Sequence, residues 1–112
     1  MALATDISWY RGEDILINVS MTPAMDITGW TIAFNVRQNY GDPGSPLITK
    51  STSGGQIALT NAPGGFFAVT INSADTSGLA PRGYVYDISR IDSGSESVLC
   101  VGNLFLRPGV RI

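Results

Sequence analysis

One stretch of the sequence decides the fold: Asp26-Ile27-Thr28-Gly29-Trp30-Thr31-Ile32-Ala33-Phe34-Asn35-Val36-Arg37. A turn signal opens it, and a strict alternation of side chains follows. Successive side chains of a strand point to opposite faces, so the alternation predicts a sheet with one buried side. The buried side is predicted to hold the large apolar residues and to form the centre of the core: Trp30, Ile32, Phe34 and Val36.

Working outward, other short runs have the same period or a similar apolar character. They span residues 7–10, 15–21, 47–51, 56–60, 66–71, 84–91 and 98–106. Turn residues separate them at intervals of roughly 8–12 residues, which is typical of an all-β protein. We therefore predict an immunoglobulin-like antiparallel β-sandwich of about seven strands. Residues 1–112 are expected to form one domain with short docking segments at both ends.

Four local features are predicted as well. Residues 53–55 are expected to join the two strands beside them as a hairpin, and residues 73–79 to form a helical turn capped by Asn72 or Ser73. Gly102, inside the last strand, suggests a bulge or a bend. The spacing of Leu79 and Tyr84 resembles a tyrosine corner, with Tyr86 as the alternative.

The composition of the chain argues against several classes of partner and of chemistry. A net charge of −2 gives no broad basic field, so neither nucleic acid nor an acidic membrane is an expected partner. No basic region precedes an apolar run at the N-terminus, so we expect no signal peptide and a soluble protein. Histidine, the commonest general base and metal ligand, is missing from the sequence.

The remaining reactive residue types have structural interpretations. Cys100 lies in an apolar run with no histidine to activate it, so a buried thiol is expected. Adjacent Glu13 and Asp14 would point to opposite sides of a strand. The segment from Asp92 to Glu96 fits a hairpin tip better than a calcium loop. Asp87 could accept a hydrogen bond or face water. We predict no enzyme, no catalytic residue, no cofactor and no metal site.

The order of the turn and core signals is distinctive. It begins with Trp9-Tyr10-Arg11-Gly12-Glu13-Asp14 and continues with Asp26-Ile27-Thr28-Gly29-Trp30 and Phe34-Asn35-Val36-Arg37. It ends with Gly83-Tyr84-Val85-Tyr86-Asp87-Ile88 and Gly102-Asn103-Leu104-Phe105-Leu106. From about Ile7 to Val110 the chain resembles the immunoglobulin-like domains of tailed-bacteriophage virion proteins, and is similar to the N-terminal domain of baseplate upper proteins. That family usually has Arg-Gly-Asp-Thr where this chain has Arg11-Gly12-Glu13-Asp14.

The resemblance implies a non-enzymatic structural protein of the virion, made in the host cytoplasm. A baseplate upper protein continues into receptor-binding modules, whereas this chain stops at Ile112. The expectation is therefore a capsid decoration (cement) protein bound to the major capsid protein, with a homotrimer as a suggested state. The alternative is a small tail, neck or baseplate adaptor that contacts tail or baseplate proteins.

Four residues are candidates for partner binding. Leu3 lies in an N-terminal segment, and Val110 and Ile112 in a C-terminal segment, that could dock on a neighbour or simply fray. Phe66 falls on the face of its predicted strand opposite to Phe67, so one ring is expected in the core and the other in a subunit contact.

A second hypothesis is a carbohydrate- or receptor-binding module at the tail tip. It requires at least two exposed aromatic side chains, drawn from Trp9, Tyr10 and Tyr40, clustered beside polar groups. A third hypothesis is a secreted immunoglobulin-like adhesion domain. The absence of an expected signal peptide and the unpaired Cys100 argue against it.

Overall fold

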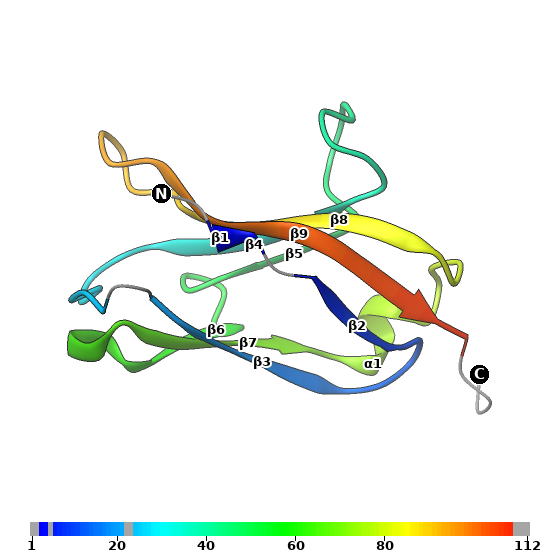
Figure 1. Cartoon of the computed structure of the whole chain (residues 1–112), viewed down its shortest axis with the longest axis horizontal. Helices are drawn as coiled ribbons and strands as arrows, with labels where there is room; N and C mark the ends of the chain where they lie inside the picture. The colour runs from blue at the N-terminus through cyan, green and yellow to red at the C-terminus, as the bar shows by residue number, and fades with distance from the viewer. Residues whose placement is uncertain (1–2, 5, 22–23, 109–112) are drawn as a thin grey trace.

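The computed structural model describes residues 3–4, 6–21 and 24–108 as an all-β, immunoglobulin-like sandwich of two sheets (Figure 1). Its strands are β1 (Leu3–Ala4), β2 (Ile7–Tyr10), β3 (Ile15–Ser20), β4 (Ile32–Arg37), β5 (Ile48–Ser51), β6 (Ile57–Asn61), β7 (Phe66–Ile71), β8 (Gly83–Arg90) and β9 (Ser97–Arg107). A 3₁₀ turn, η1 (Ala62–Gly64), precedes β7, and a single helical turn, α1 (Ser73–Thr76), follows it.

The two sheets differ in size. One has six strands in the order β1-β9-β8-β4-β5, with β2 also paired to β9, and the other has three in the order β3-β7-β6. Both β1 and β2 run parallel to β9, whereas the other neighbours are antiparallel. This two-sheet plan is that of an immunoglobulin-like domain. The predicted fold class is confirmed, although the described residues form nine strands rather than about seven.

The decisive stretch lies at the centre of the core, as predicted. Ile32, Phe34 and Val36 of β4 are each 0% exposed. Phe34 packs against Tyr86 of the neighbouring strand β8, with ring centroids 5.7 Å apart. Trp30 differs from the prediction, because it precedes β4 and is only half-buried at the margin of the core. The Arg90 guanidinium lies 4.3 Å from the centre of its indole ring.

The tyrosine corner is present at Tyr84. Its hydroxyl donates a hydrogen bond of 2.6 Å to the carbonyl oxygen of Ala80, and its side chain is buried. The Tyr86 hydroxyl instead lies 3.5 Å from the sulfur of Cys100. The hydrogen bond at Tyr84 ties the segment that follows α1 to the start of β8. This bond holds the connection by which the chain crosses from the smaller sheet to the larger one.

The helical turn is also confirmed, although it ends at Thr76 rather than near residue 79, and Asn72 is its N-cap. The carboxylate of Asp75 accepts a hydrogen bond of 2.7 Å from the Asn72 amide, which is half of a capping box. The same Asp75 reaches across to Lys50 of β5 at 2.8 Å, and that lysine is buried. The short turn, which follows β7 of the smaller sheet, is therefore tied to β5 of the larger sheet.

The predicted hairpin around residues 53–55 is wrong. Strand β5 pairs with β4 in the larger sheet, and β6 pairs with β7 in the smaller one. The turn carries the chain across the sandwich, so that Ile48 and Ile57 face the core from opposite sheets. A local turn signal does not distinguish a hairpin from such a crossing.

The predicted irregularity at Gly102 is wrong as well. The register of β8 and β9 shifts at Leu99, between the partners of Ile88 and Ser89, whereas Gly102 lies in regular register opposite Tyr86. A residue without a side chain suits this buried position, since its cross-strand neighbour on the same face is a large ring.

No helix of the described residues is long and apolar enough to cross a bilayer.

Candidate interaction surface

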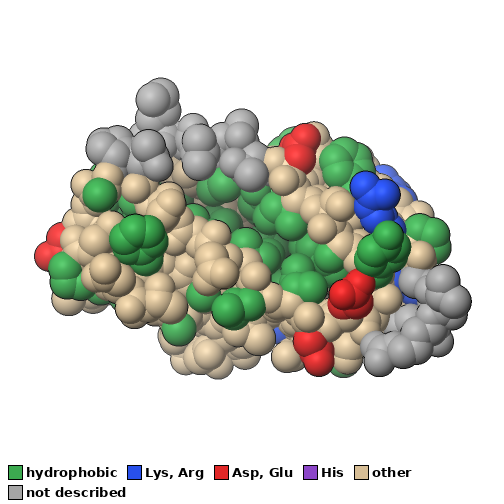
Figure 2. Space-filling model, turned by 60° about the horizontal axis from the view of Figure 1, so that its bottom comes forward, with side chains coloured by type: hydrophobic (Ala, Val, Ile, Leu, Met, Phe, Trp, Pro, Cys, Tyr) green, Lys and Arg blue, Asp and Glu red, His purple; other side chains and the backbone are tan. Residues whose placement is uncertain are grey.

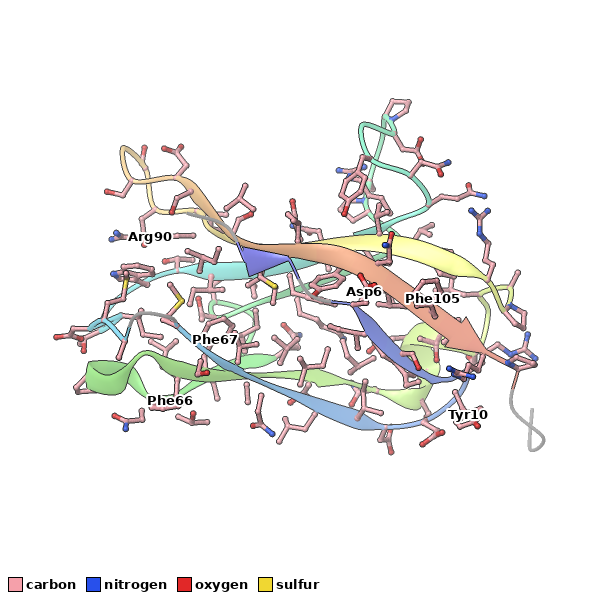
Figure 3. All side chains as sticks on the ribbon, viewed as in Figure 1. Asp6, Tyr10, Phe66, Phe67, Arg90 and Phe105 are labelled. Carbon is pink, nitrogen blue, oxygen red and sulfur yellow. The ribbon has the colours of Figure 1, made fainter. Side chains whose placement is uncertain are left out.

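The two adjacent phenylalanines at the start of β7 point to opposite sides of the smaller sheet (Figure 3). Phe67 is 1% exposed and belongs to the core, whereas Phe66 is 44% exposed. The prediction that one ring packs inside and the other faces outward is confirmed. The outward ring lies against the turn before the strand, because a Cβ on Gly64 would meet it at 3.1 Å.

Phe66 lies on a sheet face that carries no charge. The cross-strand partners Ser20 and Phe66, Asn18 and Ala68, and Leu16 and Thr70 share this outer face with β6. We call it the uncharged face, defined by these residues: Leu16, Asn18, Ser20, Ala58, Thr60, Phe66, Ala68 and Thr70. Figure 2 shows the side of the molecule on which this sheet lies, and the charged side chains in that view lie mainly toward its right-hand end.

The uncharged face is hollowed next to Phe66. The hollow measures about 190 Å³ and is lined by Asn18, Ser20, Thr60 and Phe66, with the backbone of the strands below. Leu16, at the other end of β3, is the second exposed large apolar side chain of the face, at 57%. The face thus offers an apolar projection, a hollow and no charge that a partner would have to neutralise.

The outer face of the larger sheet is different in character. Tyr10 and Phe105 are about half exposed at one end of it (Figure 3), and the Phe105 ring covers Gly83, where a Cβ would lie 3.6 Å away. Their neighbour Arg107 donates a hydrogen bond to the hydroxyl of Ser8. Aromatic and charged groups are therefore mixed on this face.

A second hollow, of about 130 Å³, lies farther along the larger sheet beside the loop after β4. Tyr40 crosses over it and donates a hydrogen bond of 3.1 Å to the carbonyl of Gly102. Arg37 is fixed by the carbonyls of Asp42 and Gly44. Asp87, whose surroundings the sequence left open, lines the same hollow, and its Oδ1 is buried with no hydrogen-bond partner.

Trp9 does not serve as a stacking platform, contrary to the carbohydrate hypothesis, because it is only 6% exposed. Tyr10 and Tyr40 are exposed, but they lie on different segments: β2 and the loop after β4. Of the aromatic candidates, Tyr40 has the polar neighbours that the hypothesis requires.

The predicted N-terminal docking segment contributes to the protein's own sheet. Leu3 lies in β1, whose backbone pairs with β9 in register with Cys100. The strand lies at the edge of the larger sheet, so one side of its backbone is already used within the chain. Val110 and Ile112 lie outside the described residues, and their role in partner binding stays a prediction.

The acidic residues have structural contacts. Asp14 accepts a hydrogen bond of 2.6 Å from the Ser73 amide, and Glu96 accepts one from Gly94 within the β8–β9 hairpin. Within residues 3–4, 6–21 and 24–108, no group of three or more acidic, cysteine or histidine side chains could hold a metal ion. Cys100 is buried. The pKa of Tyr86 is raised, mainly because its hydroxyl is buried and also because it contacts Cys100.

Asp92 fastens the β8–β9 hairpin to the start of β4. Its Oδ2 accepts hydrogen bonds from Arg90 Nε at 2.8 Å and from the Thr31 amide at 2.9 Å. The bond from Arg90, then that from Thr31, lowers the pKa of Asp92 from 3.8 to about 2. The folded state therefore favours the ionised form.

This shift predicts how the Asp92→Asn variant responds to acid. A lowered pKa in the folded state stabilises the protein above the ordinary pKa, and the stabilisation disappears as the pH falls through the folded value. Asp92→Asn should be less stable than the wild type at neutral pH, with the difference shrinking between pH 3.8 and about 2. Urea denaturation over a pH series measures this, and a difference that is the same at every pH would contradict it.

Comparisons with known proteins give limited information. No family model matches the chain, and a search of curated proteins gives no match either. Among solved structures, the extracellular fragment of novel immune-type receptor 10 from Ictalurus punctatus aligns with 95% of this chain and 98% of that chain. The two are 14% identical, with a TM-score of 0.39. A similarity of this size carries no functional argument, and the fold assignment rests on the strand order described above.

Proposed function

We propose that this protein is a non-enzymatic structural component of a tailed-phage virion that acts by contact through its uncharged face. The observation that carries the proposal is the exposure of Phe66 at the edge of a hollow, on a sheet face without charged residues. Burial of the Phe66 and Leu16 side chains by a partner would contribute roughly 25 cal/mol to the binding free energy for every Å² of apolar surface removed from water. The virion assignment itself rests on the resemblance of the sequence to virion proteins.

The role we favour is that of a capsid decoration protein held on the head lattice by the major capsid protein. A decoration protein needs a rigid body and a contact face that associates without costly desolvation of charges. The sandwich core and the uncharged face supply these two properties. A small tail, neck or baseplate adaptor uses the same properties and is the alternative placement.

Several carboxylates that could perform chemistry take part in structural contacts instead, which also supports a contact role. Asp75 is paired with Lys50, Asp92 closes a hairpin, and Asp14 binds the first amide of α1. Such contacts hold these side chains in fixed orientations within the fold.

A binding module for a polar ligand is the second candidate, favoured by the hollow under Tyr40. Its polar lining, Asn35, Arg37 and Asp87, lies beside the exposed ring of Tyr40, which supplies one of the two aromatic side chains that the hypothesis requires. If this candidate is right, a glycan panel should yield a ligand whose binding is lost in Tyr40→Ala. A panel in which no glycan binds the wild type would count against it.

The composition of purified virus particles tests the virion assignment. In particles from cells that encode the chain, mass spectrometry should find the protein in a fixed ratio to the major capsid protein. It should remain with the particles through a density gradient. A protein that stays in the cell lysate while complete particles form without it would contradict the proposal.

A further inference from the structure

Strand β3 has a free backbone edge. It is the outermost strand of the smaller sheet and pairs only with β7 among the described residues. The Met21 amide donates to Gly65 on the β7 side. Because backbone groups alternate in direction along an antiparallel strand, the amides and carbonyls of Leu16, Asn18 and Ser20 point away from β7, toward the open edge.

This edge lacks the devices that usually protect edge strands. Residues 15–20 contain neither proline nor any charged side chain, and their register with β7 has no bulge. Other edges of the sandwich are better protected. Strand β5 contains Lys50, the pairing of β6 with β7 is irregular between Ala58 and Asn61, and Asp6 separates β1 from β2.

The core is also less well covered beside β3. The inward side chains Ile15, Ile17 and Val19 are half-buried, although their partners on β7 are at most 1% exposed. Figure 2 shows hydrophobic side chains in a recess at the centre of its view. A strand added along β3 would therefore bury apolar surface as well as satisfy backbone groups.

The pattern of β3 fits a second copy of the same strand. Directly opposite residues of two paired strands lie on the same face of the sheet. When the two strands are identical and related by a two-fold axis, opposite residues must therefore be an even number of positions apart, which places one residue directly opposite its own copy. The three residues with outward backbone groups are symmetric about Asn18. Placing the axis there pairs Leu16 with the second copy's Ser20, and Ile17 with the second copy's Val19.

This register also joins the apolar features of the uncharged face. In one copy Leu16 and Phe66 lie at opposite ends, because Leu16 is opposite Thr70 and Phe66 is opposite Ser20. The two-fold rotation brings the second copy's Leu16 beside Ser20, at the hollow that Phe66 lines. Each copy thus supplies both the projection and the hollow, and identical uncharged strands do not repel each other.

We propose that β3 pairs antiparallel with β3 of a second copy, with the two Asn18 residues directly opposite, to form a homodimer with one continuous sheet. The inference does not rest on the virion assignment: the dimer is measured on the purified protein, and the particle test is independent of it. It differs from the trimer that the family resemblance suggests.

Sedimentation equilibrium across a range of concentrations gives the first test. The wild type should show a reversible dimer with twice the mass of the chain. A monomer at every concentration, or a trimer, would overturn the proposal.

A charge swap at Asn18 tests the register. Asn18→Lys and Asn18→Asp should each be folded and monomeric, because like charges would lie directly opposite, and an equal mixture of the two should form the heterodimer. Ala58→Lys is the matched control, since Ala58 is exposed in the same cross-strand row but on β6, at the opposite edge of the sheet from β3. Ala58→Lys should remain dimeric. Failure of the mixture to dimerise would overturn the register.

Cross-linking provides an independent readout. The Cα atoms of a hydrogen-bonded antiparallel pair lie about 5.5 Å apart, which is within the range that a disulfide spans. Asn18→Cys should give a disulfide-linked dimer under mild oxidation, whereas Ala58→Cys should not. The native Cys100 is buried and should contribute little. Equal cross-linking of both variants would contradict the specific pairing.

Discussion

Phe34→Ala is expected to lower the free energy of unfolding by about 3–5 kcal/mol, because it removes a large ring from the centre of the core. Phe34 is 0% exposed in β4, which lies between β8 and β5 in the larger sheet, and its ring lies 5.7 Å from that of Tyr86 at an angle of 34°. Removing the ring leaves a cavity that flanking strands cannot fill, since both are held by backbone pairing with β4.

Urea denaturation of the isolated protein measures this loss. Phe66→Ala is the matched control, because it removes the same ring from a side chain that is 44% exposed. The control should cost far less than Phe34→Ala. Similar losses for the two variants would show that the decisive stretch is not the centre of the core.

Asp75→Ala has the second-largest expected effect, a loss of about 3 kcal/mol. The side chain of Lys50 is 8% exposed, and its ammonium group lies 2.8 Å from Asp75. Without the carboxylate, the ammonium is left charged between the sheets with no opposite charge beside it. The variant also loses the hydrogen bond that Asp75 accepts from the Asn72 amide, which weakens the start of α1.

The companion variant Lys50→Met separates these contributions. Methionine fills a similar volume without a charge, and Asp75 is 22% exposed and keeps its bond to Asn72, so the loss should be smaller. The double variant Lys50→Met/Asp75→Ala should be more stable than Asp75→Ala alone. If Asp75→Ala proved harmless in urea denaturation, the ammonium would be reaching water rather than depending on the pair.

The sequence predicted the features that depend on local alternation. Phe66 and Phe67 were assigned to opposite faces because neighbouring strand residues always diverge, and Tyr84 was a candidate corner because of its distance from Leu79. These properties depend on a few consecutive residues. Most strands, with bounds that differ by one or two residues, and the capped turn at Asn72 followed for the same reason, whereas β1 was not predicted.

Features that depend on pairing between distant segments were not predictable. The turn at residues 53–55 has the composition of a hairpin, and only the sheet order shows that it joins β5 to β6 across the sandwich. Lys50 occupies an inward position of β5, and its partner Asp75 comes from α1. The open edge of β3 likewise becomes visible only when the strand order is known.

The most direct test of the central claim is the Phe66→Asp variant, measured for both folding and incorporation into particles. Its free energy of unfolding should stay within about 0.5 kcal/mol of the wild type, as for an ordinary surface substitution. Phe67→Asp, the control on the core side, should fail to fold, because that position is 1% exposed. Particles made with Phe66→Asp should lack the protein. An unfolded Phe66→Asp variant would place the ring in the core, and a folded one that joins particles normally would show that the uncharged face is not the contact.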